Sequence, residues 1–343
     1  MKKILLYTLL FSTVSSLSFA DYVKGNEAYE RMDYLTADAE LEECLREKDE
    51  RCQYLAGLMA YNGYGVIQDY EKAFSLFSQA AEQKHTRSRT YVAYMYDEGK
   101  GVGQDKRKAF ELYQESANEG DVIAITNLGV LYYRGEGIPQ NYDKAFELLD
   151  SIENVKDPLL QFYLGNLYYY GHGAPKDLNK AVSYYKRAAY LGSEEAHYML
   201  GYLYQNGYGV DRDIQQALSY YEYAAVRGHA QAQYNLASMY SDPQLGLTNK
   251  VKAYAWLSEA AKNGLEQAQT ELDRLSEAMS SSEISQAKAE EVSLNKRVTN
   301  KEAETPIKED EVPEYYTVKV IPTTITPDSV PTRPMPRRMR RRR

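Results

Sequence analysis

The 343-residue sequence contains little of the chemistry on which enzymes and metalloproteins usually depend. It has two cysteines, one tryptophan and four histidines. The histidines are scattered, and no group of His, Cys and Asp residues has the spacing of metal ligands. No Gly-Lys-Ser or Gly-Lys-Thr accompanies its glycine pairs, which argues against a phosphate-binding loop. We therefore expect no metal, no cofactor and no catalytic constellation.

Long hydrophobic runs are also missing. The longest, residues 4–11, is too short for a comfortable membrane span, and it follows Lys2 and Lys3. Ser18-Phe19-Ala20 offers small residues for cleavage, so residues 1–20 are predicted to be a signal peptide. An uncleaved membrane anchor is the alternative. No cysteine stands directly after the cleavage point, so no lipid anchor is expected, and the mature chain is predicted to be periplasmic or secreted.

Tyrosine, in contrast, is abundant, with 34 residues against seven phenylalanines. Most tyrosines fall within a pattern that recurs every 36 residues. Gly201, for example, returns as Gly165, Gly129 and Gly57, and as alanine at positions 93 and 237. A fixed period of this size indicates an array of stacked structural repeats.

Each repeat reads as two short helices joined by a glycine turn. In one copy, residues 196–205 and 214–227 carry apolar and small residues at helical spacing. Gly207 and Gly209 separate them and permit positive φ angles. The same glycine pair recurs at 63/65, 99/101, 135/137 and 171/173. One such hairpin cannot bury its apolar face alone, whereas stacked neighbours can.

The recurring motif is Leu-Gly-x-x-Tyr-x-x-Gly-x-Gly, then an acidic residue, Lys-Ala, an aromatic pair and Ala-Ala. It resembles the Sel1-like repeat, a relative of the tetratricopeptide repeat. The resemblance implies an all-α, right-handed α-solenoid of stacked helix-turn-helix units, six of them over residues 52–267.

Two units depart from the motif. Residues 152–156 lack the Ala-Ala pair and the closing glycine, and Pro243-Gln244-Leu245 replaces a glycine turn, so a local bend or an altered cap is expected at each.

The segments on either side of the repeats are predicted to cap the stack. Residues 21–51 read as a divergent amino-terminal helix pair. After the repeats, residues 268–298 are predicted to form capping helices, the last starting near Ser280. From residue 299 onward the composition predicts a disordered tail. The tail ends in a basic tip made of Arg337, Arg338, Arg340, Arg341, Arg342 and Arg343.

Cys44 and Cys52 occupy a pair of positions that is small on both sides in most other repeats. This suggests that the two positions touch, and in an exported chain two cysteines there favour a disulfide. Sel1-like families with paired cysteines show the same spacing. Two free buried thiols are the alternative.

A second set of residues lies on the side of the first helices opposite the Leu and Tyr of the motif. By resemblance to tetratricopeptide arrays, this side lines a concave groove, where tyrosines suit recognition of a protein or an extended peptide. Packing of these rings against neighbouring repeats is the alternative. The set comprises Tyr54, Tyr61, Tyr94, Asp97, Tyr133, Phe162, Tyr169, Tyr198, Tyr202, Gln205 and Tyr234.

The function predicted from the sequence is a non-catalytic interaction scaffold or adaptor of the bacterial cell envelope. One alternative is an envelope enzyme acting on peptidoglycan or β-lactams, because Ser183 and Lys186 match Ser-x-x-Lys. No Lys-Thr-Gly or Ser-Asp-Asn accompanies that pair, so chance is the better interpretation. The other alternative is an adaptor whose arginine tip binds a polyanionic surface, since the tail holds ten basic residues and the body is acidic. No specific nucleic-acid partner is expected.

Overall fold

The computed structural model describes residues 19–301 and Pro306. Most of the predicted signal peptide, the rest of the tail and the arginine tip lie outside the described residues. Within them every regular element is a helix and there is no strand. The predicted all-helical repeat architecture is therefore confirmed.

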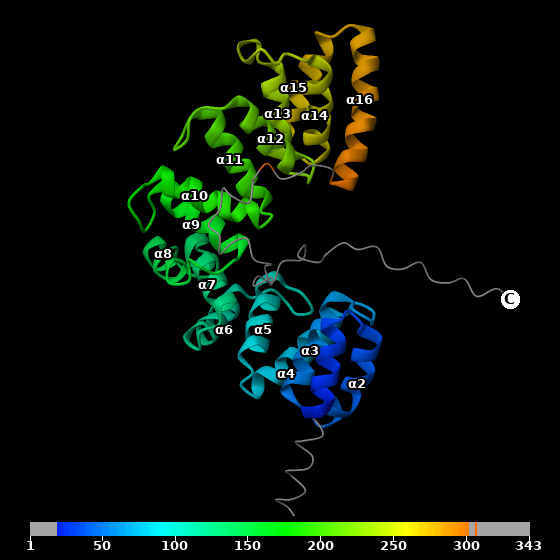
Figure 1. Ribbon diagram of the computed structural model, residues 1–343, viewed down its shortest axis with the longest axis vertical. Coiled ribbons are helices and arrows are strands. Elements are labelled where there is room, and N and C mark those ends of the chain that lie inside the picture. The colour runs from blue at the N-terminus through cyan, green and yellow to red at the C-terminus, as the bar shows by residue number, and fades with distance from the viewer. Residues whose placement is uncertain (1–18, 302–305, 307–343) are drawn as a thin grey trace, which may run out of the picture. The chain divides into compact units, whose positions relative to one another are not determined.

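The helices fall into two compact units, which are described separately (Figure 1). Of the described residues, 19–128 and 136–138 belong to the first unit, and 129–135 and 139–301 to the second. The first unit contains a helix over residues 19–30, then α2 (Tyr34–Arg46), α3 (Glu50–Asn62), α4 (Tyr70–Glu82), α5 (Thr86–Glu98), α6 (Lys106–Asn118) and the start of α7 (Val122–Arg134). The second contains the end of α7, then α8 (Tyr142–Asp150), α9 (Pro158–Tyr170), α10 (Leu178–Tyr190), α11 (Glu194–Asn206), α12 (Ile214–Ala225), α13 (Ala230–Ser241), the 3-10 helix η1 (Pro243–Leu245), α14 (Lys250–Lys262), α15 (Glu266–Glu277) and α16 (Ser281–Asn300).

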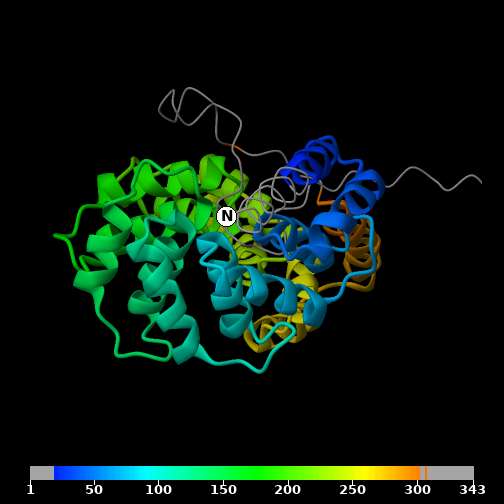
Figure 2. The ribbon, with the colours of Figure 1, turned by 90° about the horizontal axis from the view of Figure 1, so that it is seen from below.

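Each repeat is a hairpin of two helices, an A helix followed by a B helix. The A helices are α3, α5, α7, α9, α11, α13 and α15, and the B helices are α4, α6, α8, α10, α12, α14 and α16. A and B helices pack together in the hairpins α3–α4, α5–α6, α9–α10, α11–α12 and α13–α14, and α4, α8, α10, α12 and α14 also pack on the following A helix. Figure 2 shows these hairpins from below. Stacking thus buries faces that a single hairpin leaves open.

The acidic residue of the motif is a helix cap. Asp69 precedes α4, and its side chain accepts a hydrogen bond from the backbone amide of Lys72. A cap of this kind satisfies one of the amides that a helix start leaves without a partner. The same position caps α2 through Asp33, and it caps α6, α8, α10, α12 and α14 through Asp105, Asn141, Asp177, Asp213 and Asn249.

The glycine pair ends the A helix and allows close contact with the preceding repeat. Gly99 ends α5 in the left-handed conformation, with φ of 68°. Gly101, with φ of 69°, lies so close to the start of α4 that an added Cβ would be 2.2 Å from the carbonyl oxygen of Tyr70. The second glycine is therefore required both by its φ angle and by a contact with backbone.

Both predicted departures from the motif alter the structure locally. α8 ends at Asp150 after nine residues, and turns over residues 151–155 replace its last helical turn. After α13, η1 replaces the first glycine turn, and Gly246 then adopts φ of 66°. The hairpin pattern resumes after each irregularity.

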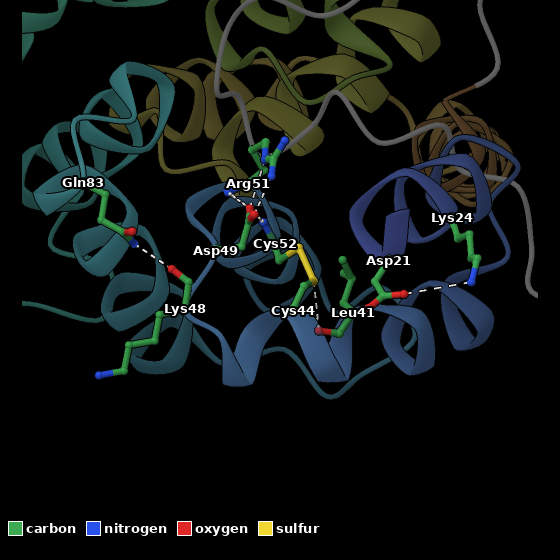
Figure 3. The surroundings of a disulfide bond; sticks show 9 residues. All are labelled: Asp21, Lys24, Leu41, Cys44, Lys48, Asp49, Arg51, Cys52 and Gln83. Atoms are coloured by element: carbon green, nitrogen blue, oxygen red, sulfur yellow. Dashed lines mark hydrogen bonds and ion pairs between the residues drawn. A yellow bond between two sulfur atoms is a disulfide. The ribbon is translucent and has the colours of Figure 1, made fainter. Parts of the chain in front are cut away.

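A disulfide joins the amino-terminal helices of the first unit. Cys44 near the end of α2 and Cys52 at the start of α3 are bonded, with their Cα atoms 6.2 Å apart (Figure 3). Asp49 caps α3, and its carboxylate also pairs with the Arg51 guanidinium at 2.5 Å. Gln83 at the end of α4 donates a hydrogen bond to the carbonyl of Lys48 in the turn between the two cysteines. The predicted disulfide is present in the structure.

Candidate functional site

The residues predicted to line the groove all lie on A helices, where they occupy three positions of the repeat. We call this the A-helix surface. The first position holds Tyr54, Phe162, Tyr198 and Tyr234, the second holds Tyr94 and Tyr202, and the third holds Tyr61, Asp97, Tyr133, Tyr169 and Gln205.

In the first unit, three of the residues predicted to line the groove are buried. Tyr61, Tyr94 and Asp97 are only 5%, 6% and 9% exposed. Two lysines contact these side chains. Lys100 donates hydrogen bonds to the hydroxyls of Tyr61 and Tyr94, at 3.1 and 3.4 Å, and Lys106 pairs with Asp97 at 2.6 Å. The remaining eight residues are half-buried.

First-position rings pack against both their own repeat and the next. The ring centroid of Tyr198 lies 5.9 Å from that of Tyr221 on α12 and 4.5 Å from that of His229. Tyr54 makes the equivalent contact with His85, at 4.9 Å. His85 and His229 cap α5 and α13 by accepting hydrogen bonds from backbone amides. These tyrosines therefore stabilise the stacking of repeats, whether or not they also bind a ligand.

Burial reinforces the neutral state of two tyrosines of this surface. It raises the pKa of Tyr94 to about 12, and it raises that of Tyr169 to about 12 as well. Both hydroxyls are consequently neutral over the physiological range. A hydroxyl that keeps its proton both donates and accepts hydrogen bonds, so the surface offers neutral amphipathic rings instead of negative charge.

The motif tyrosines, expected to pack between helices, gain a feature that sequence reasoning missed. The Lys108 ammonium lies 4.4 Å from the ring centroid of Tyr96, and Lys180 lies 4.7 Å from that of Tyr168. Such contacts are favourable because a ring face is electron-rich. The signal was available, because lysine follows tyrosine by twelve residues in these repeats.

An open cleft of about 520 Å³ lies in the second unit, where the repeat loses its glycine turn. Ala237 and Leu257, 1% and 4% exposed, supply a buried apolar floor. Charged residues of both signs line the cleft. The full lining is Tyr234, Ala237, Ser238, Ser241, Asp242, Pro243, Thr248, Lys250, Leu257, Glu271, Arg274 and Leu275.

Small residues explain why the cleft opens here. Ser238 stands at the second position, where α11 carries Tyr202, and Ser241 stands at the third position, where α9 carries Tyr169. Leu257 replaces the B-helix aromatic that α12 supplies as Tyr221. Less side-chain volume leaves a hollow instead of a closed row of rings. Of the predicted groove residues, only Tyr234 lines it; the two serines were missed, although aligning the repeats shows them.

Two exposed tyrosines were also missed. Tyr170 and Tyr208 are 52% and 42% exposed. Tyr170 occupies a repeat position that elsewhere holds Asn62, Glu98 and Arg134. An aromatic residue at an otherwise polar position is a signal that the repeat alignment already contains.

The serine of the Ser-x-x-Lys pair does not lie in a cavity. Ser183 is exposed on α10, and the Lys186 ammonium lies 5.9 Å from the ring centroid of Tyr204. Among residues 19–301, no group of three or more His, Cys, Asp or Glu side chains is placed to hold a metal ion. No helix in this part of the chain is both long and apolar enough to cross a membrane.

Comparison with known proteins identifies the repeat. The Sel1 repeat model matches residues 51–85, 87–121, 122–151, 158–193, 194–229 and 230–265. No curated protein matches the chain in sequence.

Two solved structures show the same architecture. One is c5321, a protective antigen of uropathogenic Escherichia coli with an SLR fold. It is 26% identical to this chain, with a TM-score of 0.62 over 84% of this chain and 62% of that one. This chain thus spans about three fifths of its length. The other is a Sel1 repeat protein from Oxalobacter formigenes, 28% identical, with a TM-score of 0.60 over 70% of this chain and 99% of that one.

Proposed function

The chain belongs to the Sel1 repeat family, and from this premise we propose that it is a non-catalytic scaffold that binds a protein or extended peptide on its A-helix surface. The cleft beside Tyr234 carries the proposal. Its volume of about 520 Å³ suits one or two side chains of a partner. The apolar floor would bury an anchor residue, and the rim would bind polar groups around it.

The polar groups of the rim favour a polypeptide partner over a highly charged ligand. Arg274 pairs with Glu271 at 2.8 Å, and Lys250 donates a hydrogen bond to the carbonyl of Ala278 at 2.9 Å. Because both basic groups already have partners, the cleft offers no concentrated positive charge. Backbone amides and carbonyls of a peptide match such a mixed rim.

Two features support a location in the cell envelope. Residues 1–20 have the pattern of a signal peptide, and the Cys44–Cys52 disulfide is the kind of bond that oxidising compartments maintain. We propose that the mature chain is periplasmic or secreted.

The test fills the cleft with the residues that other repeats carry. Ser238→Tyr and Ser241→Tyr, combined in the full-length chain, place two rings where the hollow lies. Partners captured from the cell envelope by crosslinking to wild type are identified and purified, and their affinities are measured by calorimetry. We expect the double variant to bind at least tenfold more weakly, which corresponds to about 1.4 kcal/mol.

Ser219→Tyr is the matched control, because Ser219 is exposed on the B helix α12. It should bind as wild type does. Circular dichroism melts of all variants check that the helices persist. If the filled cleft binds with unchanged affinity, the partner uses another surface and the proposed site is wrong.

The enzyme alternative has its own measurement. Ser183 lies exposed outside any cleft described here, so we expect no covalent labelling by a fluorescent penicillin. Labelling of wild type that disappears in Ser183→Ala would favour the enzyme.

The remaining alternative is an arginine tip that binds a polyanionic surface. It predicts that anionic vesicles capture the full-length chain but not a chain that lacks residues 302–343.

A further inference from the structure

Aromatic rings, two of them exposed and the others half-buried, gather at the ends of α9 and α11 in the second unit. We call Tyr169, Tyr170, His172, Tyr202 and Tyr208 the tyrosine stripe. The ring centroids of Tyr169 and Tyr170 are 4.8 Å apart, and the ring of Tyr170 stacks with that of His172 at 5.5 Å. The side chains of Tyr169 and Tyr202 interact, and the ring centroids of Tyr208 and Tyr202 are 5.9 Å apart. The stripe is thus one connected set of rings.

Among the described residues, only one ring of the stripe has a basic partner, whereas basic side chains lie over rings in several other parts of the fold. Elsewhere a lysine or arginine lies over the ring, as Lys108 does over Tyr96 and Arg227 over Tyr223. Within the stripe, Lys176 lies 5.6 Å from the ring centroid of Tyr169. In the described part of the chain, no lysine or arginine lies over Tyr170, Tyr202 or Tyr208. The exposed sides of Tyr170 and Tyr208 are therefore available to a cation from elsewhere.

The tail of this chain has the complementary chemistry. It ends in Pro331-Thr332-Arg333-Pro334-Met335-Pro336, followed by six arginines and one methionine. Proline-rich segments with this spacing bind aromatic surfaces in an extended form, because proline restricts φ and so reduces the entropy lost on binding. Arginine is the cation most often found over aromatic rings.

We propose that residues 331–343 of the same chain bind the tyrosine stripe, with prolines against the exposed rings of Tyr170 and Tyr208 and arginine guanidinium groups over their faces. The tail holds ten basic and seven acidic residues and the body is acidic, so long-range attraction also favours contact with the folded part.

The connecting segment is long enough. α16 ends at Asn300 within the second unit, and residues 301–330 separate it from the proline segment. Thirty residues extend to roughly 100 Å, whereas the 20-residue α16 is about 30 Å long. Tethering keeps the effective concentration of the tail high, so weak individual contacts are sufficient.

A docked tail would compete with a partner, an expectation that rests on the proposed function. Tyr169 and Tyr202 belong to the A-helix surface, so a partner that extends along this surface would have to displace the tail. Deleting residues 302–343 should then increase the affinity for such a partner severalfold.

The docking itself is tested without a partner. Met335 of the full-length chain is replaced by the photo-crosslinking residue p-benzoylphenylalanine, and illuminated products are separated by mass and mapped by peptide mass spectrometry. We expect products of monomer mass, joined to residues 169–172 or 202–208. Raising the salt concentration from 50 to 500 mM should lower the yield severalfold, since arginine contacts are screened.

Tyr170→Ala with Tyr208→Ala should lower that yield at least fivefold. The matched control is Leu35→Ala with Ile67→Ala, because these side chains are 75% and 91% exposed and lie in the first unit; it should leave the yield unchanged. Crosslinks at other residues, crosslinks found only in dimers, or a yield unaffected by the tyrosine pair would each overturn the proposal. None of these results bears on the cleft, which the serine variants test separately.

Discussion

At the scale of single residues, the stack depends on glycines, because their lack of a side chain lets neighbouring helices approach closely. The glycine of the Leu-Gly pair lies against a large B-helix side chain in several repeats. A Cβ added to Gly165 would lie 2.7 Å from the ring of Tyr185, and one added to Gly129 would lie 2.7 Å from Leu149. The A and B helices of a hairpin approach closely because nothing occupies that space.

Gly201→Ala should therefore destabilise the protein. The new methyl group would lie 2.6 Å from Cδ1 of Tyr221, a fully buried ring. Overpacking of this kind costs about 1–3 kcal/mol of unfolding free energy, measurable by urea denaturation. Gly103→Ala is the control, because its Cβ would meet no atom within 4 Å, and its stability should stay within about 0.5 kcal/mol of wild type. Equal stability of the two variants would mean that the helices do not pack closely at Gly201.

His197 should make stability depend on pH. Burial lowers the pKa of His197 to about 3, from an ordinary value of 6.5, and the charge of Arg227 adds to the decrease. The unfolded chain then binds more protons between these two values, so stability is complete above about pH 6.5 and falls as the pH drops. The slope from one such group approaches 1.4 kcal/mol per pH unit.

The variant His197→Phe keeps a ring to stack on Tyr223, whose centroid lies 3.6 Å away, but it cannot take up a proton. Urea denaturation of both proteins from pH 7 to pH 4 should show a shallower fall for the variant. Parallel curves would contradict the assignment of this pH dependence to His197.

At the scale of helices, each repeat carries its own start and stop signals, whereas the first helices also depend on a covalent bond. The described helix over residues 19–30 and α2 precede the first matched repeat at residue 51. α2 buries only Ala37, Leu41 and Cys44. With so little apolar area buried, a crosslink to α3 contributes a large share of its attachment.

Breaking the disulfide should loosen this end of the chain. The bond links residues eight apart in sequence, and closing so short a loop stabilises by about 2–3 kcal/mol in the chain-entropy model. Cys44→Ala with Cys52→Ala should lose about that amount in urea denaturation, and reductant should destabilise wild type but not the variant. Hydrogen exchange of α2 is expected to accelerate more than that of α11; uniform acceleration would argue against a local effect.

At the scale of the molecule, the end of the stack is closed by a mostly polar helix. α16 buries Ala287 and Leu294, and its Glu291 accepts a hydrogen bond from Ser258 at 2.8 Å and pairs with Lys262 at 2.7 Å. Arg297 pairs with Glu222 on α12. The last repeat thus obtains from α16 the cover that a following repeat would give it.

Removing residues 279–343 should expose that end. Trp256, the only tryptophan, is 5% exposed and belongs to the same apolar cluster as Leu294. We expect its fluorescence to move to longer wavelength and the melting temperature to fall by several degrees. Deleting residues 302–343 alone should leave the emission unchanged, so a shift there would show that the tail itself covers the cluster.

The sequence by itself determined the repeat, its period and its boundaries, because these depend on local chemistry. The repeat is specified by aspartate caps, paired glycines at positive φ and small residues at helix crossings. Each of these acts within a few residues of its own position, so the pattern can be recognised directly in the sequence. The disulfide was predictable for a related reason, since the repeat frame shows which positions touch.

Only the tertiary structure decided which tyrosines remain open to a ligand. Tyr61 and Tyr94 occupy the same repeat positions as Tyr133 and Tyr202, yet they are buried, pack on each other and accept hydrogen bonds from Lys100. The cleft forms because two helices, α13 and α14, both lack aromatic rings at positions where other repeats carry them. The size of a cleft depends on the volumes of side chains that come together from distant parts of the chain, so no single segment of the sequence determines it.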